Sequence, residues 1–521
     1  MSTNPRVARN SAAKAAEIAL FAFGAICGTF RCLAQRQAAI LSLVLLAGTA
    51  QAAGMGVDEA RLLLNRTGFG ATPQEIAEYA RYARTEAVER LLRGARNLPR
   101  GFGPEWIDEY QRPGALRALS EDERKAAQRV QFERAVELRS WWLTEMLATS
   151  SPLTERMTLF WHNHFVSSLQ KVKSPKLMYR QNLLLRRHAL GNFGELLHAV
   201  SKDPAMIVYL DTATNRRGRP NENFAREAME LFTLGEGNYT EQDVREAARA
   251  FTGWSIEPET GEYRWRPFAH DGGAKTVLGR SGNFDGDAVL DILLAQPATA
   301  EFVVAKLWRE FVSPQPDAAE VRRIGARFRD SDYDIKVALR ELLLSPGFWA
   351  ASNRAALIKS PVDLVVGTLH ELEISIGDPL PFVLALRQLG QDLFAPPNVK
   401  GWPGGEAWIN STTLLARKQF LQRLLRAQAE PADSRGASMP AGPASMSSPA
   451  RLGMDGRERF MRAAAAVRLD RSAWFGRLQA APGTSVERVL LAGDPARPVP
   501  SAMPEQELLR QLLLDPAYQL K

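Results

Sequence analysis

Apolar residues recur at intervals of three and four along most of the chain from Val57 onward, which is the spacing of one face of an α-helix. Pro, Gly, Ser and Asp interrupt this pattern at the points where helices begin and end. Strict alternation of apolar and polar residues, the pattern of a strand, is scarce. The pattern predicts helices over residues 121–148, 154–166, 176–190, 221–234, 241–251, 288–294, 300–311, 335–344 and 412–425.

One segment departs from the helical pattern. Between residues 254 and 268, Tyr263 and Trp265 alternate with charged neighbours, and Glu259-Thr260-Gly261 has the composition of a turn. We therefore expect a β-hairpin in the region of about 254–278. The expected fold class is mainly α, a large multi-helix array with a small β-hairpin insertion.

Changes in composition divide the chain into segments. Residues 431–449 are rich in Ala, Ser, Gly and Pro and contain little to bury, which is typical of a flexible linker or loop. We predict a helical core over 53–430, a linker or loop over 431–450, and a C-terminal helical segment over 451–521 that packs on the core.

Residues 1–52 have the pattern of an export signal. Arg31 and Arg36 precede an apolar stretch, 38–48, and Ala50-Gln51-Ala52 follows it with the small residues of a signal peptidase site. We expect this segment to be removed and the protein to be exported, to the periplasm or the extracellular space. Both cysteines of the chain lie in this segment. Its removal therefore excludes a cysteine nucleophile and a cysteine-ligated metal site from the mature protein.

The net charge of +8 says little about partners, because half of it lies in the first 52 residues. Nucleic-acid binding needs clustered basic residues together with stacking aromatic residues. Only short basic patches such as 216–219 occur, so we expect no nucleic-acid partner. The apolar runs 18–30 and 38–48 are shorter than the roughly 18 to 20 residues that cross a bilayer. We therefore expect no stable transmembrane span after processing.

Six ordered motifs resemble those of the DUF1800 family of exported bacterial proteins. They are residues 160–165 (FWHNHF), 203–206 (DPAM), 221–227 (NENFARE), 251–254 (FTGW), 270–271 (HD) and 396–405 (PPNVKGWPGG). The resemblance extends from about Asp58 to the C-terminus. It implies a large exported protein with no assigned reaction, often encoded beside a DUF1501-type protein, which the resemblance thereby implies as a partner.

His162, His164 and Glu222 are candidate ligands of a divalent cation. Residues two apart on a helix point about 200° away from each other. Both His side chains therefore reach one ion only if the helix ends or distorts near them. The alternative is that each is a structural histidine packed among the neighbouring aromatic residues.

The segment 221–234 carries a row of charges. Glu222, Arg226 and Glu230 are spaced four apart, which allows ion pairs along one helix face, and Glu227 lies on the adjoining flank. One interpretation is the solvated face of an amphipathic helix. The other is a carboxylate-rich wall of a cleft, in which Glu227 or Glu230 binds a hard cation or acts as a catalytic general base.

Two loops hold further candidates. His270-Asp271 follows the predicted hairpin in a Gly-containing loop, where it forms either a catalytic acid-base or metal site or a plain turn. The loop 395–410 contains Asn398, Lys400 and Trp402, which are candidate substrate-binding residues. A Trp in such a loop either stacks on a sugar or peptide or anchors the loop to the core.

Two classes of function fit these motifs. The first is a metal-assisted hydrolase that acts on an envelope or environmental polymer. The second is a non-catalytic protein that binds or assembles with the DUF1501-type neighbour. For an enzyme we expect the His162/His164 region, the segment 222–230 and His270-Asp271 to meet at one concave surface. Placement on separate faces favours the binding protein.

Overall fold

The computed structural model describes residues 54–110, 119–426, 454–500 and 502–521. The chain divides into two compact units, Met1–Gly54 and Met55–Lys521. All helices and strands named below belong to the second unit. The predicted export signal, 1–52, and the predicted linker, 431–450, lie outside the described residues.

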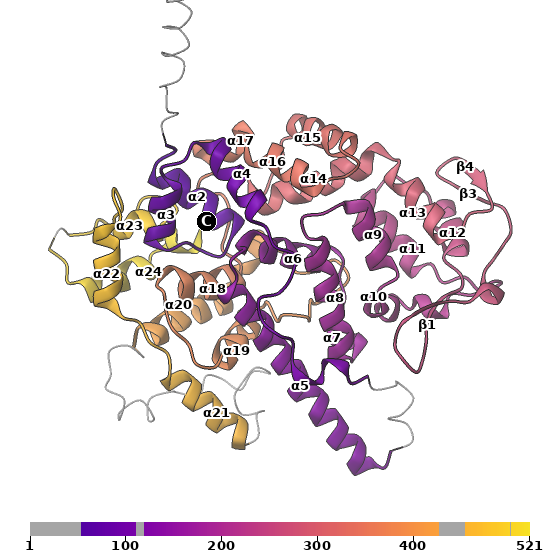
Figure 1. The fold of residues 1–521 in the computed structure, drawn as a ribbon, viewed down its shortest axis with the longest axis horizontal. Helices are drawn as coiled ribbons and strands as arrows, with labels where there is room; N and C mark the ends of the chain where they lie inside the picture. The colour runs from indigo at the N-terminus through magenta and orange to yellow at the C-terminus, as the bar shows by residue number, and fades with distance from the viewer. Residues whose placement is uncertain (1–53, 111–118, 427–453, 501) are drawn as a thin grey trace, which may run out of the picture. The chain divides into compact units, whose positions relative to one another are not determined.

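Helices dominate the described residues, so the predicted mainly α fold class is confirmed. The first α-helices in chain order (Figure 1) are α2 Val57–Thr67, α3 Pro73–Tyr79, α4 Arg84–Gly94, α5 Glu121–Ala148, α6 Pro152–His164, α7 Leu169–Val172, α8 Pro175–His188, α9 Phe193–Ser201, α10 Pro204–Tyr209, α11 Asn223–Glu227 and α12 Glu241–Ala250. They are followed by α13 Gly286–Leu294, α14 Pro297–Phe311, α15 Ala318–Asp330, α16 Ile335–Leu343, α17 Pro346–Trp349, α18 Pro361–Glu371, α19 Leu380–Gln388, α20 Ser411–Arg426, α21 Met454–Ala465, α22 Arg471–Ala480, α23 Val486–Leu490 and α24 Glu505–Leu513.

Shorter elements complete the unit. The 3-10 helices used below are η5 Pro267–Ala269 and η7 Gly405–Trp408, and η4 Ala228–Thr233 is a π-helix. The strands are β1 Trp254–Ile256, β2 Tyr263–Trp265, β3 Lys275–Val277 and β4 Arg280–Gly282. Within the described ranges, no single helix is long and apolar enough to cross a membrane, and the one helix pair of sufficient combined length, α13 and α14, is bent by 73° at its junction.

Local signals set the ends of many helices. α5 begins with a capping box, in which Glu123 N donates to Ser120 Oγ and Ser120 N donates to the Glu123 carboxylate. α18 begins with a second capping box at Ser360 and has Pro361 at its first position. Because such signals are local, the predicted helix limits fall within about three residues of the observed ones.

The β insertion holds two hairpins where we predicted one. β1 pairs antiparallel with β2 around the predicted turn, and β3 pairs antiparallel with β4. Strand structure therefore continues past residue 278, the predicted limit. The second turn has left-handed backbone at Leu278, with φ 49°, and at Gly279, with φ 77°. Leu is rare at such a position, so Gly279 alone is left as a turn signal in the sequence.

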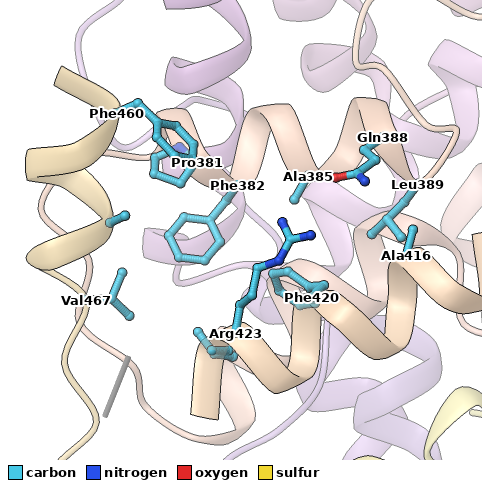
Figure 2. Close-up of a pocket in the computed structure, with 12 residues that line it drawn as sticks. Pro381, Phe382, Ala385, Gln388, Leu389, Ala416, Phe420, Arg423, Phe460 and Val467 are labelled. Carbon is cyan, nitrogen blue, oxygen red and sulfur yellow. The ribbon is translucent and has the colours of Figure 1, made fainter. Parts of the chain in front are cut away.

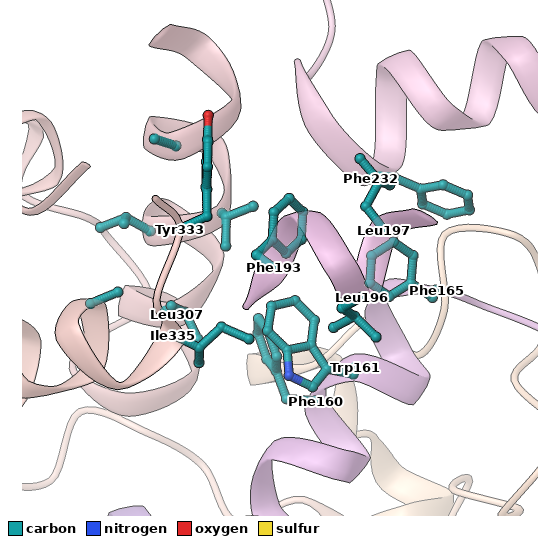
Figure 3. Packing of buried hydrophobic residues seen from close by; sticks show 14 of the residues in the cluster. Phe160, Trp161, Phe165, Phe193, Leu196, Leu197, Phe232, Leu307, Tyr333 and Ile335 are labelled. Atoms are coloured by element: carbon teal, nitrogen blue, oxygen red, sulfur yellow. The ribbon is translucent and has the colours of Figure 1, made fainter. Parts of the chain in front are cut away.

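Apolar side chains form two buried clusters that meet at α6. Trp161 of α6 and Phe165, which follows the end of this helix, pack against Phe193 of α9, with ring centroids 5.7 Å and 6.2 Å away (Figure 3). Leu159 of the same helix belongs to the second cluster, together with Trp142 of α5. Burying side chains of this size stabilises the fold by about 1.5–3 kcal/mol each. α6 is thus fixed on both sides, and the site described below is built on it.

The C-terminal residues lie against the segment that precedes α18. Lys521 N donates to Leu357 O at 2.8 Å. The Lys521 side chain lies 2.8 Å from an oxygen of the buried Asp363 carboxylate, to which Arg156 of α6 also donates. These contacts bring α6, α18 and residue 521 together around one internal space.

Candidate functional site

A cavity of about 560 Å³ lies between α6, α14, the start of α18 and the loop 395–410. Among the predicted site residues, His164, Lys400 and Trp402 line it. The charged residues of its wall are five cations and three carboxylates, namely Arg156, Lys306, Arg309, Lys400, Lys521, Glu310, Asp363 and Glu406. The cavity therefore has an excess of positive charge.

Two of these cations are neutralised by carboxylates of the wall. Arg156 pairs with Asp363 and lies 3.2 Å from Glu310, and Lys521 lies 2.8 Å from Asp363. Burial alone raises the pKa of Asp363, but the Arg156 guanidinium and the Lys521 ammonium outweigh it and hold that pKa well below its usual range. This cluster acts as a structural part of the wall, because its charges already satisfy one another.

His162 points away from the cavity. Its ring contacts the rings of Trp142, Phe394 and Trp402, with centroids 5.4 to 5.6 Å apart. Burial lowers the pKa of His162 to about 3, so the ring is neutral. Its Nε2 has no hydrogen-bond partner in the described part of the chain. The surroundings are those of a packed core histidine, and among the described residues no carboxylate pairs with it.

His164 points in the other direction, toward α14 and the π-helix. Its Nε2–H donates to Phe232 O at 3.1 Å, and its Nδ1 accepts from Lys306 Nζ at 3.1 Å. These partners use both ring nitrogens. Burial, with the nearby Lys306 charge, lowers the pKa of His164 well below its usual value. The two histidines thus diverge, as expected for positions about 200° apart, and do not reach one ion.

Lys306 lies at the centre of this arrangement, and we did not predict it as a site residue. Its Nζ donates to Leu231 O at 2.9 Å as well as to His164, and it lies 4.7 Å from the centre of the Phe302 ring. No ion pair with a carboxylate forms at this amine among the described residues. Burial, followed by the charge of Arg309, lowers the pKa of Lys306 to about 8.

The main-chain oxygens around Lys306 belong to the end of the π-helix η4. The predicted helix 221–234 is therefore α-helical only over α11, and a π-helix follows it. Leu234 N and Gly235 N both donate to Met229 O, at 2.8 and 3.2 Å. The carbonyls of Leu231 and Phe232 remain as acceptors for side chains of neighbouring elements.

The charged row on this segment is divided between two environments. Arg226 lies 3.1 Å from Glu222 and 2.7 Å from Glu241 of α12. Glu241 is exposed, and Glu222 and Arg226 are half-buried, so Glu222 takes part in an ion-pair face that water reaches. That is the first of the two interpretations offered above, and Glu222 lies apart from both histidines.

Glu227 and Glu230 face the loop 395–410. Glu230 accepts from Tyr239 Oη at 3.0 Å and lies 3.6 Å from Lys400 Nζ. Burial first, and then the neighbouring Glu230 charge, raise the pKa of Glu227. The two carboxylates therefore lie beside Lys400 at the edge of the cavity, although neither lines it.

His270 and Asp271 lie elsewhere. Arg249 of α12 donates to Asp271 at 2.8 Å and lowers the pKa of Asp271 to about 2. His270 Nδ1 lies 3.0 Å from Thr252 O, and its ring contacts the Trp265 ring at 4.9 Å. Neither residue lines the cavity. They form a local tie between α12 and the β insertion.

The loop 395–410 is fixed by α6. Trp402 N donates to Asn163 Oδ1 at 2.7 Å, and Asn163 Nδ2 donates to Trp402 O at 3.4 Å. Trp402 and Trp408 are buried, so their surroundings favour the anchoring interpretation over an open stacking surface. Asn398 Oδ1 accepts from Lys400 N at 2.9 Å, which shapes the turn that presents Lys400.

The structure thus brings together only part of the predicted constellation. His164, Lys400 and Trp402 line one cavity, and Glu227 and Glu230 lie at its edge beside Lys400. His162, Glu222, His270 and Asp271 lie outside it. Among the described residues, no group of three or more His, Cys, Asp or Glu side chains is arranged to hold a metal ion. The cations Lys306 and Arg309 were not predicted, because charged residues are ordinary on an amphipathic helix such as 300–311, which also holds Glu301 and Glu310.

A second pocket, of about 110 Å³, is lined mainly by apolar side chains of α19, α20 and α21. Phe382 and Phe420 form its walls, and the Arg423 side chain extends across it (Figure 2). Arg423 also donates to Gln419 Oε1 at 3.1 Å. None of the residues predicted as site residues lines this pocket.

No curated protein and no solved structure is significantly similar to the chain. The family model described as "Protein of unknown function (DUF1800)" matches residues 62–520, which is nearly the whole chain. The six motifs singled out from the sequence all lie within this range. The chain therefore belongs to the DUF1800 family.

Proposed function

We propose that the protein is a binding protein that takes the anionic end of an envelope or environmental polymer into the 560 Å³ cavity. The observation that carries this proposal is the pair Lys306 and Arg309. They lie three residues apart on one face of α14, line the cavity, and have no ion-pair partner among the described residues. A carboxylate or phosphate group is the ligand that such a pair recognises.

The size and walls of the cavity support the same function. Its volume lies within the range of about 300–1,000 Å³ that is typical of small-molecule sites. Leu159, Phe160 and Trp402 supply apolar wall, and Asn163 and Lys400 supply polar groups at the side of the loop. A charge-assisted hydrogen bond in such a site contributes about 1.5–3 kcal/mol. For an anion bound by both cations, these interactions therefore outweigh the loss of its hydration in water.

The metal-assisted hydrolase predicted from the motifs lacks the arrangement on which it depended. His162 and His164 diverge, Glu222 is paired with Arg226, and Asp271 is paired with Arg249. By the criterion stated above, this favours the binding protein. Assembly with a DUF1501-type product stays a prediction, as do export and a periplasmic or extracellular location.

Isothermal titration calorimetry with inorganic phosphate, citrate and a short oligogalacturonate tests the proposal. Arg309→Met should weaken binding of the anion roughly 10-fold to 100-fold, which corresponds to about 1.5–3 kcal/mol. Arg322→Met is the matched control, because Arg322 is also an exposed arginine without a partner among the described residues but lies on α15, outside the cavity. Equal affinity of the two variants for each anion would contradict the proposal.

A further inference from the structure

A second cationic surface lies outside the cavity, on the turn 216–219 next to the β insertion. Arg219 N donates to Arg216 O at 2.9 Å, and Gly218 has φ 79°, so the four residues form a tight turn. The side chains of Arg216, Arg217 and Arg219 are exposed. None of the three has a hydrogen bond or ion pair to a side chain of the described residues. Three uncompensated charges therefore project from one turn.

Two exposed aromatic side chains stand beside this turn. Arg217 N donates to Ala269 O at 2.7 Å, which fixes the turn against the short helix η5. Phe268, in η5, is 78% exposed, and Trp265, at the end of β2, is 37% exposed. The Trp265 ring packs on His270, with centroids 4.9 Å apart. The aromatic residues are thus held in place beside the arginines.

The other arginines of the insertion differ in their surroundings. Arg266 donates to Ile256 O, whereas Arg280 of β4 is exposed and has no ion pair among the described residues. Arg264 pairs with Glu257, and Arg180 of α8, outside the insertion, lies 2.5 Å from Glu262. The free positive charge is therefore densest at the turn 216–219, which carries three such arginines, and Arg280 adds a single one in β4. A compact patch of this kind matches a few phosphate groups more closely than the backbone of a long polymer.

We propose that Arg216, Arg217, Arg219, Trp265 and Phe268 together bind an anionic phospholipid surface. Phe268 enters the boundary between headgroups and acyl chains, and Trp265 lies at the level of the headgroups. The guanidinium groups pair with lipid phosphates, for which their planar donors are suited. A polyanion such as a nucleic acid engages the charges but leaves the apolar surface of Phe268 in water unless a base stacks on it. The joint presence of free cations and an exposed Phe favours the lipid.

The test is co-sedimentation of the full chain with vesicles of phosphatidylglycerol and phosphatidylcholine in equal parts, at low ionic strength. Vesicles of phosphatidylcholine alone are the comparison. We expect binding to the anionic vesicles only. Arg217→Ser should weaken it about fivefold, the contribution of one basic residue near an anionic surface. Phe268→Ser should weaken it roughly 10-fold, whereas Phe268→Trp should retain it.

Two control variants separate this surface from net charge and general hydrophobicity. Arg322→Ser removes one exposed, unpartnered arginine of α15, and Phe102→Ser removes another exposed Phe. Both should bind like the unchanged protein. Equal losses in Arg217→Ser and Arg322→Ser would overturn the proposal in favour of a general charge effect. Binding to a DNA duplex or heparin without binding to the anionic vesicles would overturn it in favour of a polyanion site.

Discussion

The contact between Gly401 and Asn163 predicts a specific instability. Gly401 has φ 83°, and a Cβ at this position would clash with Asn163 Oδ1 and lie 2.8 Å from Asn163 O. Gly401→Ala should therefore carry two costs. The left-handed backbone costs about 1–2 kcal/mol for a residue with a Cβ. Displacing Asn163 breaks its two hydrogen bonds to Trp402, at about 1 kcal/mol each.

Gly237 supplies the matched control. Its φ is 86°, and no atom lies within 4 Å of the place where a Cβ would stand. Gly237→Ala therefore carries the backbone cost of about 1–2 kcal/mol alone. Gly401→Ala should lose about 2 kcal/mol more. The entropy of unfolding is about 1 kcal/mol/K for a unit as long as Met55–Lys521, so the melting temperature should fall about 2 °C further.

Differential scanning calorimetry of both variants measures this difference. In an Asn163→Ala background the two hydrogen bonds are already absent, so Gly401→Ala should lower the melting temperature by less than it does in the unchanged protein. If Gly401→Ala and Gly237→Ala lower the melting temperature equally, the hydrogen bonds between Asn163 and Trp402 do not fix the loop 395–410 that forms the cavity wall.

Three further outcomes follow from buried charges. Because the Lys306 pKa is about 8, its charge is lost as pH rises through 8; anion affinity measured by calorimetry should fall between pH 7 and 9, and Lys306→Met should flatten that profile. Burial raises the Asp203 pKa to about 7, so this group destabilises the fold increasingly between pH 4 and 7; Asp203→Asn should raise the melting temperature at pH 8 more than at pH 5. Arg186→Met leaves its buried partner Glu155 unpaired and should cost about 3–5 kcal/mol in urea unfolding, whereas Arg510→Met, which removes an exposed pair, should cost less than about 1 kcal/mol.

The sequence predicted the fold well where the signals are local. The limits of α5 follow from the capping box at Ser120 and from apolar spacing, both of which lie within the segment itself. The hairpin β3–β4 was not predicted, because Leu278, a residue rare in left-handed backbone, occupies the first central position of its turn and Gly279 alone is a weak turn signal. There the hairpin is set by contacts that are distant in sequence, such as the bond from Leu278 N to Asp243 Oδ1 at 2.7 Å.

The candidate site was predictable only in part. His164, Lys400 and Trp402 were predicted as site residues because they belong to the family-like motifs 160–165 and 396–405, and all three line the cavity. Lys306 carries little signal of its own, since its partners His164 and Leu231 lie 142 and 75 residues away. The predicted convergence of His270-Asp271 with the histidines had no local basis, and the ion pair with Arg249 holds Asp271 elsewhere. Site residues whose role depends on burial and on distant neighbours cannot be predicted from the pattern of one sequence segment.

The π-helix explains how a lysine is kept inside the protein without a carboxylate. In a regular α-helix the carbonyls of Leu231 and Phe232 would accept from N–H groups four residues on, but Gly235 N donates to Met229 O instead. The freed oxygens lie at a helix C-terminus, which carries partial negative charge. Leu231 O accepts from Lys306, and Phe232 O orients His164 so that its Nδ1 accepts from the same amine. Neutral groups thus hold the ammonium, so its charge remains uncompensated and able to attract an anion that enters the cavity.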